Sequence, residues 1–372
     1  MREFYGFMLA ALVAAWFCQY TRIGFNGKVI GRRDTNPIAE FALFAILTLF
    51  IGLRRYYNDT EIYRAGYEST VTLSEFLANL DLNLSDHIGF GFVNSCLKSL
   101  YISTQGFLLF YAGVSVGLSL YFIKKYSCNF WVSIFLFFTT NMYFMPAAAM
   151  KQYMAVVIGM LSIPCVVKKQ WIRFLLLVIL ATLFHPYALM YLLLPFLQFR
   201  PWSNGTYLLL FVTVAVGFSL EGLFDTIIDI TTMIGKGYTE EDLVGEGINL
   251  LRVLVCNVPL LISFVFRGYM FRDSTREENL LINLSMVNGA VMFMGLFGTA
   301  IYFSRLANYF TIAQCIALPW LIRRLPMDRR DKNLITACML VGYMVFFLYA
   351  NQSFDSSFER ITLFEYLKNT YK

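Results

Sequence analysis

Long apolar runs recur along the whole chain, and they restrict its fold more than any other feature of the sequence. The runs at 4–20, 38–53, 107–123 and 333–349 reach or approach the length that a helix needs to span a bilayer, which is roughly 17–25 residues. Only 15% of the residues are charged, whereas roughly 25% are charged in soluble domains. Lipid is therefore the expected solvent. The first run is expected to be a retained span, because no small-residue cleavage site follows it.

These runs predict an all-α polytopic membrane protein with about twelve transmembrane helices. A single transmembrane domain would cover 1–350, and a short extracytoplasmic tail would cover 351–372. The expected spans are, in order, 4–20, 38–53, 106–123, 129–146, 148–166, 171–184, 186–199, 205–221, 250–266, 280–303, 306–322 and 333–350.

The Lys and Arg residues predict the orientation of these spans. With the N-terminus outside, 18 of the 30 Lys and Arg residues fall in inside loops, as the positive-inside rule favours. Two longer segments, about 54–105 and 221–249, would then be extracytoplasmic. The first contains an interrupted apolar stretch at 86–103, which suits an interfacial or re-entrant helix. The second fits equally well a mobile loop that covers a site and a plain solvated connector.

Composition and motifs also exclude several classes of function. The net charge of +6 does not indicate nucleic-acid binding, because basic residues are expected on the cytoplasmic loops of membrane proteins. The Gly-Phe-Gly at 89–91 lacks the third glycine and the preceding strand of a nucleotide-binding loop. The seven cysteines are scattered without a CxxC pair, which argues against a disulfide framework or a metal site.

Few ionisable residues lie at the ends of spans. A charge within a span costs about 2.5–3.5 kcal/mol, so the presence of each one has to be explained by a structural or functional role. On the predicted topology these residues gather at the outer membrane face. They are Arg54, Arg55, Asp59, Glu61, Arg64, Lys151, His185, Arg252 and Arg305.

Several of these cations suit phosphate binding. Arg54 and Arg55 could anchor a helix end, but they lie on the side where the positive-inside rule disfavours arginine, and their planar forks suit a diphosphate. Lys151, beside Gln152, is either a snorkelling anchor or a second phosphate contact. Arg305 has Tyr302, Asn308 and Tyr309 near it at helical spacing, which indicates one polar face.

The chain has only two histidines, and one of them is a candidate general base. His185 precedes Pro186 at the break between two short spans, where proline frees backbone groups that only protein or water can satisfy. The residue is either a structural histidine or a base that acts near neutral pH. His87, in the charged outer segment, is the weaker alternative.

Four segments resemble, in order, those of the EpsG and Wzy-like bacterial polysaccharide polymerases: GLRRYYNDTEIYRAGY, MKQYMAVVIG, LFHPYALMYLLLPF and SRLANYF. The shared features are an arginine-rich outer segment with Asp-x3-Tyr, a basic-Gln pair, a Phe-His and an Arg-x3-Tyr-Phe. The residues that match are Arg54, Asp59, Tyr63, Gln152, His185, Arg305 and Tyr309. Lys151 departs from the pattern, which has arginine there, so the bidentate fork is lost.

The resemblance implies an inverting glycosyltransferase with a GT-C-like fold in the bacterial cytoplasmic membrane, with its active site on the extracytoplasmic side. Such enzymes transfer a growing glycan from undecaprenyl diphosphate onto a lipid-linked repeat unit. The implied partners are these carrier-linked units, membrane lipids, a chain-length regulator and a flippase. No cofactor is implied, and metal independence is expected because no acidic pair with metal-ligand character stands out.

The residues and the resemblance together assign three roles. His185 or Asp59 would take the acceptor proton. Tyr63, Gln152 and Tyr309 would contact the glycan. The diphosphate would bind Arg54, Arg55, Lys151, Arg252 and Arg305.

Two other functions remain open at this point. An O-antigen ligase would pass finished glycan from the same carrier to another acceptor and would share the diphosphate clamp. A lipid-linked oligosaccharide flippase or transporter belongs to a different class, which would require charges through the bilayer midplane and often paired repeats. The unusual charges gather instead at one face, and the sequence shows no internal repeat.

Overall fold

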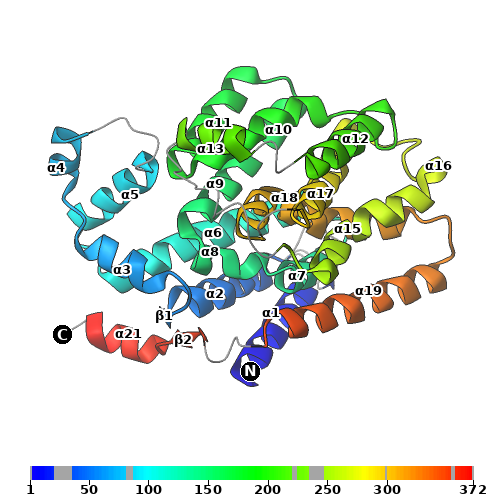
Figure 1. Cartoon of the computed structure of the whole chain (residues 1–372). Coiled ribbons are helices and arrows are strands. Elements are labelled where there is room, and N and C mark those ends of the chain that lie inside the picture. Colours follow the sequence, from blue (N-terminus) through cyan, green and yellow to red (C-terminus); the bar gives the residue numbers. More distant parts are fainter. Residues whose placement is uncertain are drawn as a thin grey trace. The chain divides into compact units, whose positions relative to one another are not determined.

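The computed structural model describes residues 2–20, 36–80, 87–219, 224–233, 247–297, 300–352 and 357–370, and these are almost wholly helical (Figure 1). They form two compact units. Unit one comprises 1–157, 183–185 and 348–372, and unit two comprises 158–182 and 186–347. The predicted helical membrane architecture is confirmed, with the addition of one two-stranded sheet that the sequence did not predict.

Many of the helices have the composition of membrane spans. Among the described residues, three helical stretches are long and apolar enough to cross a bilayer: Thr104–Tyr126, Met150–Val167 and Arg329–Ala350. Phe130–Thr139 and Met142–Ala148 form a further apolar pair, bent by 70°. The shorter apolar helices are Phe4–Tyr20, Pro37–Gly52, Trp171–Phe184, Pro186–Leu197, Asn204–Phe218 and Leu250–Val265. The total of about twelve spans and the GT-C-like fold stay predictions.

Unit one contains the N-terminal helices, the outer segment and the tail. Its elements are α1 (Arg2–Tyr20), α2 (Pro37–Gly52), β1 (Arg54–Tyr56), α3 (Thr60–Glu68), α4 (Leu73–Ala78), α5 (Ile88–Ser99), α6 (Thr104–Tyr126), α7 (Phe130–Thr139), η2 (Met142–Phe144), α8 (Met145–Ala148), the start of α9 (Met150–Met160), β2 (Glu359–Arg360) and α21 (Leu363–Thr370).

In unit one, α2 packs closely against α6. Gly52, at the end of α2, permits this approach, since a Cβ there would lie 2.7 Å from Leu109 Cδ2. Phe50 on α2 stacks on Phe7 of α1 with ring centroids 3.7 Å apart. The hydroxyl of the buried Tyr143 donates to Leu47 O at 2.8 Å. The end of α2, where the candidate arginines begin, is thereby held on several sides.

The outer segment folds as three short helices that follow β1. The interrupted apolar stretch forms α5, in agreement with the predicted short helix, and its location at a membrane interface stays a prediction. The α4 and α5 helices are joined by a hydrogen bond from Leu73 N to Ser99 Oγ at 2.8 Å. Tyr67 of α3 stacks on Phe107 of α6 at 4.4 Å, which holds the outer segment against α6.

The tail contributes a strand to unit one, which the sequence did not predict. Its β2 pairs antiparallel with β1 (Figure 1). Arg54 lies opposite Arg360 in this pairing. Phe358, just before β2, stacks on Phe50 with centroids 5.1 Å apart. The backbone N–H of Ile361 donates to Leu53 O at 2.9 Å. The tail therefore fixes the backbone at the end of α2.

Unit two contains the remaining helices. They are the end of α9, α10 (Ile163–Val167), α11 (Trp171–Phe184, whose last residues belong to unit one), the 3-10 helix η3 (Pro186–Leu197), α12 (Asn204–Phe218), α13 (Phe224–Met233), α15 (Leu250–Val265), α16 (Arg267–Met270), α17 (Arg276–Met294), α18 (Ala300–Arg324) and most of α19 (Arg329–Ala350).

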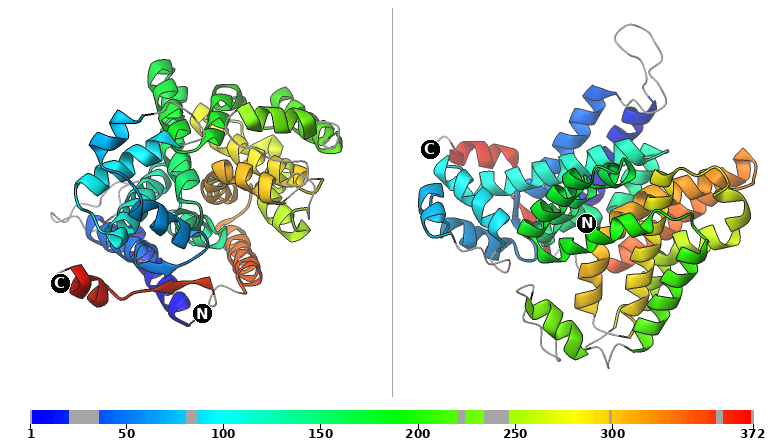
Figure 2. Two further views of the ribbon diagram at one scale, coloured as in Figure 1. Left: turned by 60° about the vertical axis from the view of Figure 1, so that its left-hand side comes forward. Right: turned by 90° about the horizontal axis from the view of Figure 1, so that it is seen from above.

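A buried polar network joins the central helices of unit two, of which α17 and α18 lie side by side (Figure 2). Thr311 Oγ1 donates to Asn288 Oδ1 at 2.9 Å. Gln314 Nε2 donates to Val255 O at 2.8 Å and to the Tyr343 hydroxyl at 2.6 Å. These side chains satisfy one another away from solvent, as buried polar groups must. This network ties α15, α17, α18 and α19 to one another.

The two span boundaries on either side of Arg305 differ from those predicted. The span expected at 280–303 ends early, because α17 ends at Met294 and Gly295 caps it. A Cβ at Gly295 would lie 2.3 Å from Ile248, so glycine is needed for this close approach. As a result, Arg305 lies inside α18 rather than between two spans, which corrects the predicted break.

Some predicted features lie outside the described residues. These are most of the acidic loop at 221–249, of which Phe224–Met233 is described as α13, and the inside-loop cations Arg22, Lys28, Arg32 and Arg33.

A prediction for unit two concerns Gly159. A Cβ at this position would lie 1.9 Å from the ring of Tyr191, which is buried and donates its hydroxyl to Tyr309 O at 3.0 Å. Gly159→Ala should therefore lower the free energy of unfolding by about 1–3 kcal/mol through overpacking, measured by thermal unfolding in detergent. Gly342→Ala is the matched control, because nothing lies within 4 Å of its added Cβ. Equal stability of the two variants would contradict the close packing of Tyr191 on Gly159.

Candidate functional site

Arg54 is the most deeply buried cation of the predicted site. It follows α2 directly, and its side chain is only 1% exposed. Its Nε donates to Thr60 Oγ1 at 3.0 Å and its Nη1 donates to Ile51 O at 2.9 Å. Nη2 is buried and has no hydrogen-bond partner among the residues that the structure describes. The guanidinium is thus held in place with one nitrogen uncommitted.

Arg54 is also a buried charge without a local counter-ion. Within the described part of the chain, no carboxylate lies within salt-bridge distance of it. Burial lowers the pKa of Arg54 to about 10, so the side chain is still a cation at neutral pH. A buried, unpaired charge is costly. An anionic ligand would compensate it, although the side chains that cover Nη2 would have to move.

Tyr63 connects Arg54 with the start of α9. Burial raises the pKa of Tyr63 to about 12, and the charge of Asp59 raises it further. Backbone hydrogen bonds from Lys151 and Met150 oppose this shift, as does the charge of Arg54. The Tyr63 oxygen therefore lies at the N-terminus of α9, where backbone N–H groups lack helical partners and attract negative charge.

Lys151 lies on the same side of α9 as this contact. Its Nζ is 5.3 Å from the ring centroid of Phe90 on α5, a cation–π arrangement. Phe90 also packs edge-on against Tyr63, with centroids 6.0 Å apart. The neighbouring Gln152 is buried, at 4% exposure. Aromatic contacts thus hold a second cation beside Tyr63.

The two histidines of the chain lie together, which the sequence did not predict. Their rings stack with centroids 5.6 Å apart and an interplanar angle of 21°. His87 caps the N-terminus of α5 in a left-handed conformation, and His185 follows α11. Gly89 makes the approach possible, since a Cβ there would lie 3.0 Å from Leu183 Cβ. We call His87 and His185 the histidine pair.

Two further residues belong to this region but were not selected as site residues from the sequence. Arg64 Nη1 donates to Gln105 Oε1 at 3.2 Å. Gln105 Nε2 donates in turn to Gly52 O at 2.7 Å and to Arg54 O at 3.3 Å. Gln105 therefore ties α6 to the backbone at Arg54 and positions Arg64. The proximity of Arg64 also contributes to the lowered pKa of Arg54, after burial.

Asp59 and Arg55 are more exposed than these residues. Asp59 precedes α3 and makes no side-chain capping bond. Arg55 lies on β1 and faces the tail, where it contributes to the lowered pKa of Glu365, after the hydrogen bonds from Thr362. Both side chains are open to solvent and available to a ligand.

The predicted residues of unit two have distinct environments. Arg305 is exposed on α18, and Arg252 is half-buried in the first turn of α15. Tyr309 is fully buried and packs edge-on against Tyr191, with centroids 5.7 Å apart. The roles predicted for these three residues in phosphate and glycan binding stay predictions.

The structure therefore brings part of the predicted site together within unit one. Arg54, Tyr63, Arg64, Phe90 and Lys151 form a connected group, which we call the cationic cluster. The histidine pair joins it through α5, because Phe90 N donates to His87 O at 2.8 Å. Among the residues that can be described, no group of three or more His, Cys, Asp or Glu residues is placed to hold a metal. Metal independence stays a prediction.

Comparisons with known proteins add one match. The family model described as EpsG family matches residues 38–366, a range that contains every candidate site residue. Neither the curated proteins nor the solved structures gave a match.

A stability prediction follows from the burial of Arg54 without a counter-ion. Replacement by an apolar residue of similar length has two opposing effects. Removal of the buried charge stabilises the fold, and loss of two hydrogen bonds destabilises it. Arg54→Met should therefore keep the free energy of unfolding within about 1 kcal/mol of the wild-type value, measured in detergent without substrate. Arg55→Met is the control, as an exposed neighbour of the same type. A loss of about 3–5 kcal/mol in Arg54→Met alone would assign Arg54 a structural role instead.

Proposed function

This chain belongs to the EpsG family, and from that premise we propose that it is a polysaccharide polymerase. It is a membrane protein of polysaccharide biosynthesis, and the proposed reaction transfers a growing glycan from undecaprenyl diphosphate onto a lipid-linked repeat unit. The reaction would occur at the outer face of the cytoplasmic membrane. The observation that carries the proposal is the cationic cluster, in which the buried Arg54 has no carboxylate partner among the described residues.

The cationic cluster suits a diphosphate for three reasons. Arg54 and Arg64 carry planar guanidinium groups, which suit phosphate oxygens, and Nη2 of Arg54 has no partner among the described residues. Lys151 adds a point charge, held on the ring of Phe90. The N-terminus of α9 contributes the positive end of a helix dipole beside the same residues. A diphosphate would place its negative charges where the ligand-free protein concentrates positive charge.

The proposed chemistry is a single displacement at the anomeric carbon. The acceptor hydroxyl oxygen forms a bond to that carbon while its proton passes to a base. The bond from the same carbon to the diphosphate oxygen breaks, and its electron pair stays on undecaprenyl diphosphate. One displacement inverts the configuration. Arg54 and Lys151 would stabilise the charge that develops on the leaving diphosphate, as preorganised donors do in other active sites.

His185 is the proposed base in this reaction. It stacks on His87, with the ring centroids 5.6 Å apart. A neutral imidazole has one ring nitrogen that can accept the proton of the acceptor hydroxyl. Asp59 is the alternative base, since it is exposed and its charge acts on Tyr63.

The remaining predicted residues keep the roles expected from the sequence. Arg55, Arg252 and Arg305 would bind phosphate, and Tyr63, Gln152 and Tyr309 would contact the glycan. All of these residues except Arg252 lie in the motif segments, and all six lie within the residues that match the family.

Gene deletion with complementation tests the proposed function. We expect deletion to remove the length ladder in glycan electrophoresis and to leave single repeats capped on the acceptor. Arg54→Ala, His185→Ala and Arg305→Ala should each fail to restore the ladder although the protein is expressed. Arg173→Ala, an exposed cation of α11, is the control that should restore it. Loss of all surface transfer would indicate a ligase, and build-up of carrier-linked units on the cytoplasmic side would indicate a flippase.

The histidine pair gives a separate kinetic prediction for the purified enzyme. His185→Gln should lower kcat by about 10²–10⁴-fold, the usual contribution of a general base. His87→Gln should lower kcat by about 10²-fold at most, with KM unchanged, because it disturbs only the position of His185. Full activity of His185→Gln would move the base to Asp59. A rise in KM alone for His87→Gln would instead make His87 a substrate-binding residue.

A further inference from the structure

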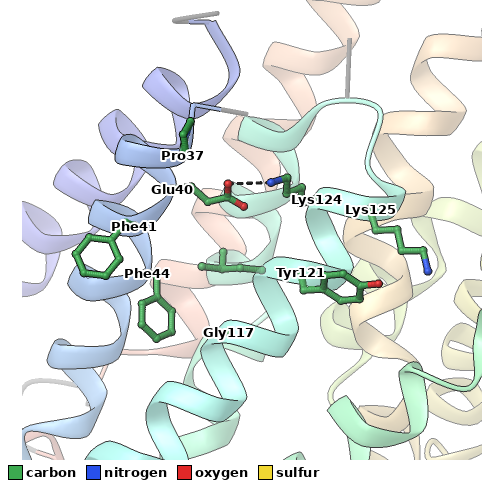
Figure 3. Close-up of a pocket in the computed structure, with 9 residues that line it drawn as sticks. Pro37, Glu40, Phe41, Phe44, Gly117, Tyr121, Lys124 and Lys125 are labelled. Carbon is green, nitrogen blue, oxygen red and sulfur yellow. Dashed lines mark hydrogen bonds and ion pairs between the residues drawn. The ribbon is translucent and has the colours of Figure 1, made fainter. Parts of the chain in front are cut away.

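A groove lies between α2 and α6, at the end of α6 opposite to Gln105. Its cavity has a volume of about 590 Å³, and Figure 3 shows the side chains around it. The residues that line it are Pro37, Glu40, Phe41, Phe44, Gly117, Leu120, Tyr121, Lys124 and Lys125. None of them belongs to the cationic cluster or to the histidine pair, so the proposed reaction leaves this groove unexplained.

The walls of the groove are mostly apolar, and two of their aromatic side chains are exposed. Phe41 is 71% exposed and Tyr121 is 51% exposed, both on helices with the composition of membrane spans. Gly117 leaves room beside Phe44, since an added Cβ would lie 3.4 Å from Phe44 Cε2, an ordinary contact distance. A hydrocarbon chain lying between α2 and α6 would meet only apolar surface at these residues.

The charged end of the groove has one cation in excess. Glu40 Oε2 pairs with Lys124 Nζ at 2.9 Å. Lys125 Nζ lies 5.7 Å from the ring centroid of Tyr121 and 5.1 Å from that of Tyr126. For Lys125, the described residues provide no carboxylate within salt-bridge distance. Two lysines and one glutamate give the lining a net charge of +1, the complement of one phosphodiester.

The position of the groove along α6 is consistent with the polar border of a bilayer. Gln105 and Lys124 are near opposite ends of α6, and a helix rises 1.5 Å per residue, so they are separated by roughly 29 Å, close to the thickness of the hydrocarbon core. The predicted topology places Lys124 and Lys125 on the cytoplasmic side, where the leaflet carries anionic lipids.

We propose that this groove binds one anionic phospholipid of the adjacent leaflet. The phosphodiester lies against Lys125, and one acyl chain lies along Phe41, Phe44 and Leu120. The bound lipid would hold α2 against α6 at the end remote from the cationic cluster. This inference does not depend on the proposed polymerase reaction.

Native mass spectrometry of the full-length protein tests the site, with phosphatidylglycerol and phosphatidylcholine of matched acyl chains as probes. We expect the wild-type protein to retain one phosphatidylglycerol more tightly than phosphatidylcholine. Lys125→Gln should weaken phosphatidylglycerol binding about fivefold, the effect of one Lys at an anionic lipid surface. Gly117→Leu, which keeps both lysines and fills the groove, should weaken the binding of both lipids.

Two matched controls separate the groove from general effects. Lys168→Gln removes an exposed cation elsewhere, and Gly6→Leu adds a side chain where nothing lies within 4 Å of the Cβ. Both should bind like the wild-type protein. Equal affinity of the wild-type protein for the two lipids would overturn the proposal, as would unchanged binding in Lys125→Gln and Gly117→Leu. If millimolar inorganic phosphate displaced the lipid, Lys125 would be a binding site for free phosphate and not for a lipid headgroup.

Discussion

Each polar group that this chain buries must find a partner inside the protein, because a bilayer offers none. Most of the buried polar side chains obey this constraint. Asn288, Thr311, Gln314 and Tyr343 satisfy one another within unit two. In unit one, Gln105 joins three backbone and side-chain partners from three other elements. These networks fix which helices pack together, since each member would be costly to bury alone.

Arg54 departs from this constraint, and the departure supports the proposed function. Its Nε and Nη1 are bonded, but its charge has no carboxylate partner and its Nη2 has no acceptor within the described ranges. Proteins seldom retain a buried, uncompensated charge unless a ligand or a reaction uses it. The surrounding Tyr63, Arg64 and Lys151 make the same region favourable for an anion. This local imbalance of charge is the physical basis of the proposed diphosphate clamp.

Several short elements fix the positions of Arg54 and the histidine pair. The tail adds β2 beside β1 and stacks Phe358 on Phe50, so that the backbone at Arg54 is fixed from a distant part of the chain. Gly89 lets α5 approach Leu183, which brings the histidine pair together. At the far end of α6, the groove with Lys125 offers a second place for an anion, of a different chemical kind. One helix thus connects a proposed catalytic region with a proposed lipid site.

The sequence by itself determined the solvent, the helical class and the family of this protein. Apolar runs of span length and short motifs in a fixed order are local signals, which can be read without knowing what each residue touches. It also selected Arg54, Tyr63 and Lys151 as site residues, and their role stays a prediction. Only the tertiary structure decided the partners of these residues. The stacking of His87 on His185, the role of Gln105 and the strand in the tail depend on contacts between segments far apart in the chain. Such contacts follow from packing and from close approaches at glycine, and no local pattern encodes them.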